Sequence, residues 1–531
     1  MNFFYKKNKN EILFNSFETF GLKNCQNYIP IYSRFFNLTE NNYNSINLNH
    51  IHSMIKLNDR ITENEFKCDV LTENDKIIEK NIFIKFSPLL DPLKYMRGSE
   101  KCDTTINILP KLNGKNLEKM NNLNNVSYVD SFFYFLTSKL LNENKFLHGI
   151  DFFGSFLSMK EDYLYNAEDE GEYLYESEFF KKNIGTLFDI MDCDDRQQTR
   201  INKDKINVLD NIEITIDNEI ILENTNILEE DSIELLFDTS NNNCETESDS
   251  ESDSESESES ETNDSDTNPE SETDAGTQEE WDDDEQSVED IICKIKNFPV
   301  QIIAIEKCND TLDALLEGGI SDEELTSAIF QVLMILNVYQ KTFSFTHNDL
   351  HTNNIMYTKT DKVYICYKWK DRYYKVPSFG RIFKIIDFGR AIYKFQDKTF
   401  CSDSFYPKGD AATQYNFEPF YNPNKPRVEP NFSFDLCRLS CSIYDMIEDN
   451  EEEIYTLIKN WCLDDKEKNI LYKKNGEERY PDFKLYKMIA RNVHNHIPEN
   501  ELQKPLFDVY KVAKNKINKK TYIMNIDTLL N

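Results

Sequence analysis

Two short segments in the second half of the chain hold the residue types that phosphoryl transfer requires. Residues 346–356 read THNDLHTNNIM, and residues 384–391 read KIIDFGRA. In such a reaction a carboxylate orients the attacking hydroxyl and accepts its proton, and oxygen ligands hold Mg²⁺ against the phosphates. Asp349 is the candidate base, while Asn354, five residues later, and Asp387 are the candidate Mg²⁺ ligands.

The two segments resemble motifs of the eukaryotic protein kinase superfamily, the catalytic loop H-R-D-L-x-x-x-N and the D-F-G tripeptide. Either motif alone would be a weak signal, because short combinations of common residues recur by chance. Their order is more specific, since both follow a helix that the capping box Ser321–Glu324 predicts, and an apolar strand precedes D-F-G. The resemblance covers about residues 71–506 and implies ATP and Mg²⁺ as cofactors.

The resemblance also implies a lysine that contacts the α- and β-phosphates of ATP. Lys85 is the best candidate because it lies in the apolar stretch 81–86, NIFIKF, much as the family's lysine lies in V-A-I-K; Lys80 is the alternative. Kinases pair this lysine with a glutamate on a helix. Apolar spacing predicts a helix over 128–141, where Asp130, one methylene shorter than glutamate, is the only acidic residue.

The adenine-binding hinge is implied at Ile-Glu-Lys-Cys, which follows the apolar stretch VQIIA. By resemblance Ile305 would be the gatekeeper, and backbone groups of Glu306 and Cys308 would contact adenine. Asp313 would either reach the ribose or simply start the next helix.

Two later segments also fit the family pattern. Asp435, in FSFDLCRL, would brace the backbone of the catalytic loop, or would only begin a helix, where an acid interacts favourably with the helix dipole. Glu429-Pro430 resembles the end of an activation segment, and we expect Glu429 to pair with Arg491.

Three departures from the family pattern affect the expected site. No glycine occurs between Gly21 and Gly98, so Lys85 lacks the preceding glycine-rich loop whose backbone approaches phosphates closely. Asn348 replaces the arginine that normally receives an activation-loop phosphate, so switching by that modification is not expected. His351 replaces the lysine typical of Ser/Thr kinases, although it could still donate to the transferring phosphate as a catalytic residue.

The acceptor of the phosphate stays open between several classes. The loop HNDLHTNN is also similar to loops of haspin-like kinases and of phosphotransferases that act on choline or aminoglycosides. The overall pattern is most like the serine/threonine protein kinases of giant nucleocytoplasmic large DNA viruses. That resemblance implies transfer of the ATP γ-phosphate to a protein hydroxyl, in the host cytoplasm or the virion. The alternatives are a small-molecule phosphotransferase and a pseudokinase scaffold that acts through its acidic segment.

The expected fold is α+β and two-lobed, as in protein kinases. Apolar and aromatic stretches predict strands over 81–86, 150–157 and 300–305, and the later patterns are mostly helical. We therefore expect an N-terminal extension over 1–70, a strand-rich N-lobe over 71–305, and a helical C-lobe over 306–531.

The formal charge of −35 is concentrated in one segment. Between Glu245 and Asp290 lie 22 acidic residues and no Lys or Arg, which leaves −13 for the rest of the chain. A run so poor in apolar side chains predicts a disordered acidic insertion over 240–290. It could be a solvated loop, a serine-rich tract for acidophilic kinases, or a surface for basic partners. The acidic balance argues against nucleic-acid binding.

The cysteines and the apolar stretches indicate an intracellular protein. The twelve cysteines lack the spacing of metal ligands, so we expect them to be reduced. No apolar stretch approaches the roughly 18 residues that a membrane-spanning helix needs. We therefore expect no signal peptide and no membrane partner.

Overall fold

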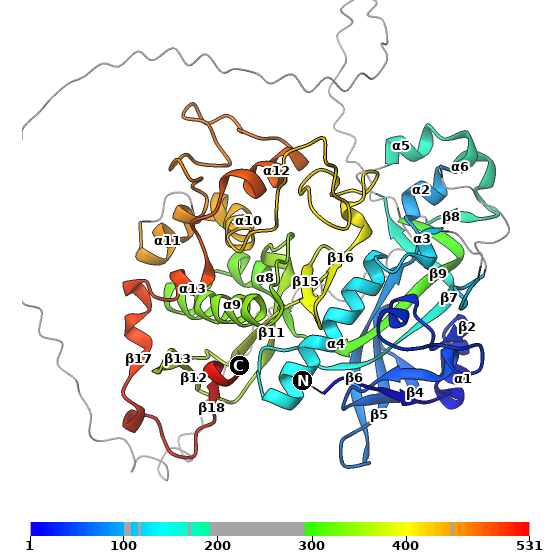
Figure 1. Cartoon of the computed structure of the whole chain (residues 1–531), viewed down its shortest axis with the longest axis horizontal. Helices are drawn as coiled ribbons and strands as arrows, with labels where there is room; N and C mark the ends of the chain where they lie inside the picture. Colours follow the sequence, from blue (N-terminus) through cyan, green and yellow to red (C-terminus); the bar gives the residue numbers. More distant parts are fainter. Residues whose placement is uncertain are drawn as a thin grey trace, which may run out of the picture. The chain divides into compact units, whose positions relative to one another are not determined.

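A seven-stranded antiparallel sheet is the largest element of the structure, a computed structural model that describes residues 2–99, 108–114, 118–167, 171–191, 292–447 and 451–529 (Figure 1). The strand order is β2-β7-β9-β6-β5-β4, and β8 pairs with β9. These strands are β2 (Leu22–Gln26), β4 (Ser53–Arg60), β5 (Glu65–Leu71), β6 (Ile77–Pro88), β7 (Phe152–Asn166), β8 (Phe188–Ile190) and β9 (Ile292–Glu306). The predicted acidic insertion over 240–290 lies outside the described residues.

Alternating burial explains why these segments form strands with one face toward the core. In β5, the side chains of Phe66, Cys68 and Val70 are buried, and those between them are more exposed. This period of two is what a strand with one covered face requires. The strands predicted from apolar stretches are confirmed within β6, β7 and β9, although β7 begins at Phe152 and all three extend beyond the predicted bounds.

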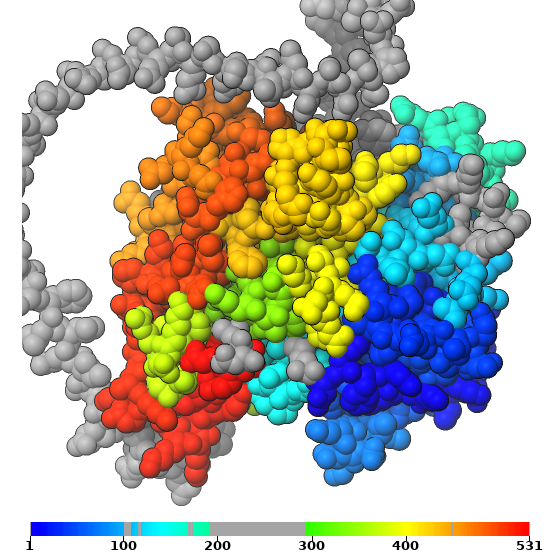
Figure 2. Space-filling view, viewed as in Figure 1, coloured from blue at the N-terminus to red at the C-terminus, as the bar shows by residue number. Residues whose placement is uncertain are grey.

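Two long helices carry much of the core. Helix α4 (Val126–Asn144) contains the predicted helical stretch, and α9 (Asp322–Phe343) begins as the capping box predicts, because Ser321 Oγ accepts a hydrogen bond from the Glu324 N–H at 3.3 Å. The rings of Phe133 and Tyr339 connect the two helices, with centroids 5.4 Å apart. One hydrophobic core therefore joins residues before 191 with residues after 292, and Figure 2 shows these parts packed against each other.

The first 70 residues contribute to the large sheet. Strands β2 and β4, and most of β5, come from this part of the chain, and β5 pairs with β6 along its whole length. The expected boundary at residue 71 therefore runs through the sheet. The division into an extension and two lobes stays a prediction.

Residues 306–531 contain more strands than the sequence analysis predicts. Three small sheets lie there, with orders β10-β11-β14, β17-β13-β12-β18 and β15-β16. Their strands are β10 (Asp310–Thr311), β11 (Ile355–Lys359), β12 (Tyr364–Trp369), β13 (Arg372–Pro377), β14 (Arg381–Ile385), β15 (Ile392–Phe395), β16 (Lys398–Cys401), β17 (Lys511–Val512) and β18 (Ile523–Asn525). The expectation of a helical second half is thus corrected to mixed α+β.

The β12–β13 hairpin has a local cause that the sequence contains. Lys370 and Asp371 form its turn, and their φ angles are 49° and 58°. Two consecutive residues at positive φ form the turn that matches the twist of paired strands. Tyrosines and β-branched residues on either side favour strands.

The remaining helices and strands are short. They are α1 (Glu11–Glu18), α2 (Pro92–Met96), α3 (Glu118–Asn121), α5 (Gly171–Tyr175), α6 (Glu178–Asn183), α8 (Leu312–Glu317), α10 (Phe434–Ile443), α11 (Glu453–Trp461), α12 (Phe483–Asn492), α13 (Pro498–Glu501), α14 (Ile526–Leu529), β1 (Tyr5–Lys7) and β3 (Ile46–Leu48). Within the described ranges, no helix has the length and apolar character needed to cross a membrane.

Candidate functional site

Strand pairing brings the two candidate Mg²⁺ ligands together. Strands β11 and β14 are antiparallel neighbours, with Ile355 opposite Ile385. Asn354 directly precedes β11, and the Ile386 N–H donates to its backbone oxygen at 3.0 Å. Because Asp387 follows Ile386, Asn354 and Asp387 lie at the same end of the β11–β14 pair.

The loop that carries Asp349 is held by a buried carboxylate. Asp435, at the start of α10, accepts hydrogen bonds from the His347 N–H at 2.9 and 3.0 Å and from the Asn348 N–H at 2.9 Å. Burial raises the pKa of Asp435 to about 7, and the N–H bonds act in the opposite direction. The position of Asp435 agrees with the bracing role that the resemblance implies.

Two side chains in this loop satisfy buried groups around it. Asn348 has a φ of 64°, a conformation that asparagine tolerates better than most residues, and its amide donates to the Arg390 oxygen and accepts from the Tyr415 hydroxyl. His347 accepts from the Asp349 N–H at Nδ1 and donates from Nε2 to the Ile386 oxygen. Burial lowers the pKa of His347, so it is neutral and fixed in this tautomer.

Lys85 lies between two carboxylates. Its Nζ is 2.8 Å from Asp130 Oδ2 and 2.8 Å from Asp387 Oδ1. The shorter side chain of Asp130 therefore reaches the lysine from α4. The alternative lysine, Lys80, lies instead over the ring of Phe153, 5.4 Å from its centroid.

Lys85 is the charge that holds this trio together, since burial and the neighbouring Asp387 raise the pKa of Asp130 to about 6, while Lys85 acts in the opposite direction. Burial alone would lower the pKa of Lys85, but the two carboxylates outweigh it and raise the pKa above its usual value. Desolvation favours the neutral form of Asp387 as well, although its side chain is 49% exposed, and Lys85 outweighs this effect and lowers the pKa to about 2. Asp387 is consequently ionised at neutral pH and is suited to bind a cation.

Helix α4 fixes the segment that contains Asp387. Asp130 Oδ1 accepts from the Phe388 N–H at 2.8 Å, and the Tyr134 hydroxyl accepts from the Asp387 N–H at 2.9 Å. The Phe388 ring packs against Phe133 and Tyr134, with centroids 4.6 and 4.8 Å away. Asp130 thus holds both Lys85 and the D-F-G backbone. Tyr134 is one of several aromatic residues in α4, and no sequence pattern distinguishes it from the others, so it was not predicted as a site residue.

Asn354 connects the metal-ligand candidates to the candidate base. Its Nδ2 donates to the Asp349 backbone oxygen at 3.0 Å and to His351 Nε2, also at 3.0 Å. Burial lowers the pKa of His351, so its neutral ring accepts at Nε2 and carries its proton on Nδ1. Within the described residues no donor bonds to Asn354 Oδ1, which leaves that oxygen for a cation.

Asp349 itself is half-buried and contacts two side chains. Its Oδ1 accepts from the Tyr486 hydroxyl at 2.8 Å, and its Oδ2 lies 3.5 Å from Arg390 Nη1. Neither partner was predicted, because Tyr486 lies 137 residues away along the chain and nothing in KIIDFGRA marks Arg390 as a partner of Asp349.

The backbone groups of the two hinge candidates, Glu306 and Cys308, differ in whether they already have hydrogen-bond partners. The Glu306 N–H donates to the Asp151 oxygen at 2.9 Å, so this backbone group is not available to adenine. Cys308 is 8% exposed, and within the described residues neither its N–H nor its carbonyl has a hydrogen bond. Asp313 accepts from Thr352 Oγ1 at 2.5 Å, which connects helix α8 to the segment 346–356.

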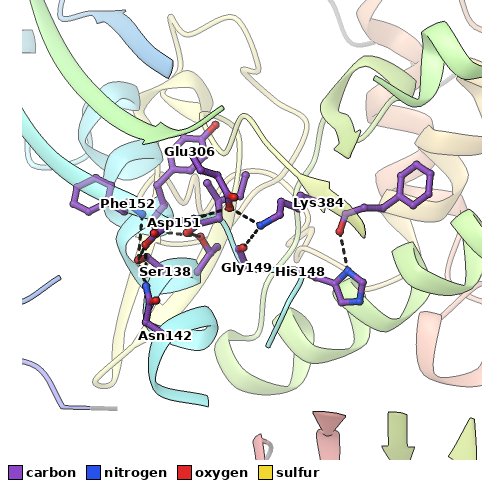
Figure 3. Close-up of polar contacts among 12 residues, drawn as sticks. Ser138, Asn142, His148, Gly149, Asp151, Phe152, Glu306 and Lys384 are labelled. Carbon is purple, nitrogen blue, oxygen red and sulfur yellow. Dashed lines mark hydrogen bonds and ion pairs between the residues drawn. The ribbon is translucent and has the colours of Figure 1, made fainter. Parts of the chain in front are cut away.

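The Glu306 side chain belongs to a buried polar network that sequence analysis did not identify. Figure 3 shows Lys384 pointing toward Glu306 and Gly149. Its Nζ pairs with the Glu306 carboxylate and donates to the Gly149 oxygen at 2.7 Å, while Glu306 also accepts from the Asp151 N–H at 2.8 Å. This network joins the end of β9 to β14, the strand that leads to Asp387.

We expect Lys384→Met to lower the free energy of unfolding by about 3–5 kcal/mol, because it leaves a carboxylate and a carbonyl without their donor. Denaturant unfolding measures the change. Lys359→Met on β11 is the control, since this lysine is exposed and makes no ion pair within the described residues. Equal stability of the two variants would contradict the role assigned to Lys384.

One expected ion pair is wrong. Glu429 pairs with Arg427, two residues away, and not with Arg491. Arg491 donates instead to the Thr413 oxygen at 2.8 Å and to the Lys487 oxygen at 2.6 Å. Each charge therefore has another partner. Glu429 pairs with a neighbouring arginine, and Arg491 bonds to backbone oxygens, one of them 78 residues away along the chain.

Comparison with known proteins gives one partial similarity. No protein-family model matches the chain. A stretch of 74 residues is 36% identical to a protein of Acanthamoeba polyphaga mimivirus named "Putative serine/threonine-protein kinase R301". The stretch covers 13% of this chain and 19% of that protein, so the chain matches about a fifth of the length of this relative. The similarity indicates a kinase-like protein and nothing finer.

Proposed function

We propose that this protein is an ATP-dependent phosphotransferase that transfers the γ-phosphate of ATP to a serine or threonine of a protein. The observation that carries the proposal is the connected set Lys85, Asp387, Asn354 and Asp349. Lys85 contacts Asp387, Asn354 bonds to Ile386, the residue before Asp387, and the Asn354 amide bonds to the loop of Asp349. This set combines the cation, the metal ligands and the base that phosphoryl transfer requires.

The residues present fit a magnesium ion. An ionised Asp387 and the free Oδ1 of Asn354 offer two oxygen ligands, and Mg²⁺ usually takes one or two protein ligands beside phosphate oxygens and water. Within the described ranges no group of three or more His, Cys, Asp or Glu side chains could hold a metal. The proposed magnesium site therefore uses only Asp387 and Asn354 as protein ligands. When bound, Mg²⁺ neutralises charge on the phosphates.

The other residues take the roles that their contacts allow. Asp349 would orient the acceptor hydroxyl and accept its proton, and Lys85, held by Asp130, would contact the α- and β-phosphates. The backbone groups of Cys308 would bind adenine. Neutral His351 has its proton on Nδ1, so it would donate to the transferring phosphate only from that atom.

The fold that we infer around this site is two-lobed. The large sheet with α4 would form one lobe, and the segment after Glu306 the other, so that Lys85 and Asp349 would face each other across the nucleotide. The similarity to a mimivirus protein supports a viral origin, and the place of action that we propose is the host cytoplasm or the virion.

We expect Lys85→Met to weaken Mg-ATP binding by about tenfold or more, because each charge-assisted hydrogen bond to a phosphate is worth about 1.5–3 kcal/mol. Isothermal titration calorimetry measures the affinity, and Lys80→Met serves as the control on the same strand. If wild type binds no Mg-ATP, the proposed function fails.

An acceptor screen separates the classes of phosphotransferase. Wild-type protein is incubated with Mg-ATP and with acceptor proteins, choline or aminoglycosides. Phosphate on serine or threonine supports the protein kinase. Phosphate on choline or an aminoglycoside assigns the site to a small-molecule phosphotransferase, and binding without turnover assigns it to a pseudokinase.

A further inference from the structure

The hydroxyl of Tyr486 bonds to the carboxylate that the proposed function assigns as the base. It donates to Asp349 Oδ1 at 2.8 Å, and Arg390 lies 3.5 Å from the other carboxylate oxygen. Both oxygens of the candidate base therefore have partners from the chain itself. An O–H donor on the base is also the contact that a serine or threonine hydroxyl makes before transfer.

We propose that the Tyr486 hydroxyl occupies the position on Asp349 that the acceptor hydroxyl takes during transfer. A substrate displaces it from Asp349 by presenting a hydroxyl next to a negatively charged group. This inference rests on the proposed function, since it takes Asp349 as the base. It adds the substrate class, a hydroxyl in an acidic setting, and a residue that controls access to the base.

Two arginines provide the argument for the negative charge. The guanidinium carbons of Arg390 and Arg438 lie 5.6 and 5.1 Å from the centre of the Tyr486 ring, and Arg438 Nε donates to the Tyr486 oxygen at 2.9 Å. Arg390 has a carboxylate partner in Asp410, at 2.8 Å. Arg438 is half-buried and makes no ion pair within the part of the chain that the structure describes.

Removal of the tyrosine from the base would leave Arg438 without its acceptor. A half-buried guanidinium that loses its partner binds a carboxylate or phosphate strongly, because its N–H groups are already desolvated. An acceptor that brings an acidic group beside its hydroxyl restores this contact. An acceptor with a neutral or basic neighbour does not.

The chemical step balances without a further reactant. The acceptor oxygen forms a bond to the γ-phosphorus of ATP, the bond between that phosphorus and the β,γ-bridging oxygen breaks, and ADP leaves. The acceptor proton passes to Asp349 Oδ1, the oxygen that Tyr486 has vacated.

The first test uses water as the acceptor, so that no protein substrate has to be known. Tyr486→Phe removes the hydroxyl and keeps the ring between the arginines. Hydrolysis of Mg-ATP by this variant should be about tenfold faster than by wild type, since one hydrogen bond to a charged group no longer competes for the base. Tyr480→Phe is the matched control, because its ring packs in the same region and its hydroxyl makes no hydrogen bond within the described residues. It should hydrolyse ATP at the wild-type rate.

The outcomes separate this inference from the proposed function. If Tyr486→Phe is no faster than Tyr480→Phe at equal thermal stability, or is slower, Tyr486 orients the base or only packs, and the inference is overturned. If wild type and both variants release no phosphate from ATP, the proposed function is wrong, and the inference that rests on it is wrong as well.

The second test concerns the charge beside the acceptor. One peptide copies residues 251–260, ESDSESESES, and its partner has Gln for each Glu and Asn for the Asp. We expect kcat/KM for the acidic peptide to exceed that of the neutral peptide by about tenfold or more, and Arg438→Gln to remove the preference while Mg-ATP affinity stays unchanged. Equal use of both peptides by wild type, or a preference that survives Arg438→Gln, would overturn the substrate class.

Discussion

Asp349→Asn should lower the rate of phosphate transfer from ATP by about 10²–10⁴-fold, the usual contribution of a positioned acid–base group. The amide keeps the shape of the carboxylate, and its oxygen can still accept from the Tyr486 hydroxyl. It cannot accept the proton of the acceptor. Mg-ATP affinity should be unchanged, because Lys85, Asn354 and Asp387 remain in place. Steady-state kinetics and calorimetry together measure the two quantities.

Asp361→Asn is the control for this prediction. Asp361 is exposed in the loop between β11 and β12 and makes no ion pair within the described residues. It should transfer phosphate at the wild-type rate. A loss of activity in Asp349→Asn that comes with a matching loss of ATP affinity would indicate a disturbed fold, and full activity would remove Asp349 as the base.

Asp435→Ala should lower the free energy of unfolding by about 2–5 kcal/mol, because two buried N–H groups lose their acceptor. The carboxylate is fully buried and receives the N–H groups of His347 and Asn348, 88 and 87 residues away along the chain. The loss would also release the loop that carries Asp349. Chemical denaturation measures the stability, and the transfer rate should fall with it.

Ser433→Ala provides the matched control at the start of the same helix. Ser433 is buried, and its Oγ has no partner among the described residues. Its removal should therefore change stability by less than about 0.5 kcal/mol. If both variants unfold at the same denaturant concentration, the bracing role of Asp435 is wrong.

Local pattern predicted much of the fold, because the strands and helices that carry it have clear periodicity. Helix α9 follows from its cap and apolar spacing, and β6 and β9 from their β-branched and aromatic residues. Of the strands after residue 306, the apolar strand before D-F-G, which is β14, was predicted. The others were missed because most are short, and pairing partners such as β12 and β18 lie far apart in sequence. Contacts with distant segments, not local preference, make such pieces extended.

The same distinction separates the predicted and missed parts of the site. Asp349, Asn354 and Asp387 lie in motifs whose spacing is local, so the sequence identified them, and their roles stay predictions. The contact of Tyr486 with Asp349 joins residues 137 positions apart in the sequence, and the Lys384–Glu306 pair joins residues 78 positions apart. The sequence signal for the Lys384–Glu306 pair was the position of Lys384 at the start of the apolar run KIIDFG, because a charge in a buried strand requires a partner.

The turn between β4 and β5, two strands of the sheet that contains Lys85, has no glycine. Residues 61–64, which connect β4 and β5, read Ile-Thr-Glu-Asn, and the Ile61 N–H donates to the Glu65 oxygen at 2.8 Å. A turn with side chains at every position keeps its backbone farther from a phosphate than glycines would. Lys85 and the metal ligands would therefore supply most of the contacts to the phosphates.

The most direct measurement of the central claim is the release or transfer of radiolabel from ATP labelled in the γ-phosphate, with Mg²⁺ present, by wild type and by Asp387→Ala. Asp387 contacts Lys85 and is one of two candidate metal ligands, so its removal should lower the rate by at least about 10²-fold. Label should move from ATP with wild-type protein and should stay on ATP with the variant. Equal rates for the two proteins, or no turnover by wild type that binds Mg-ATP, would contradict an active phosphotransfer site.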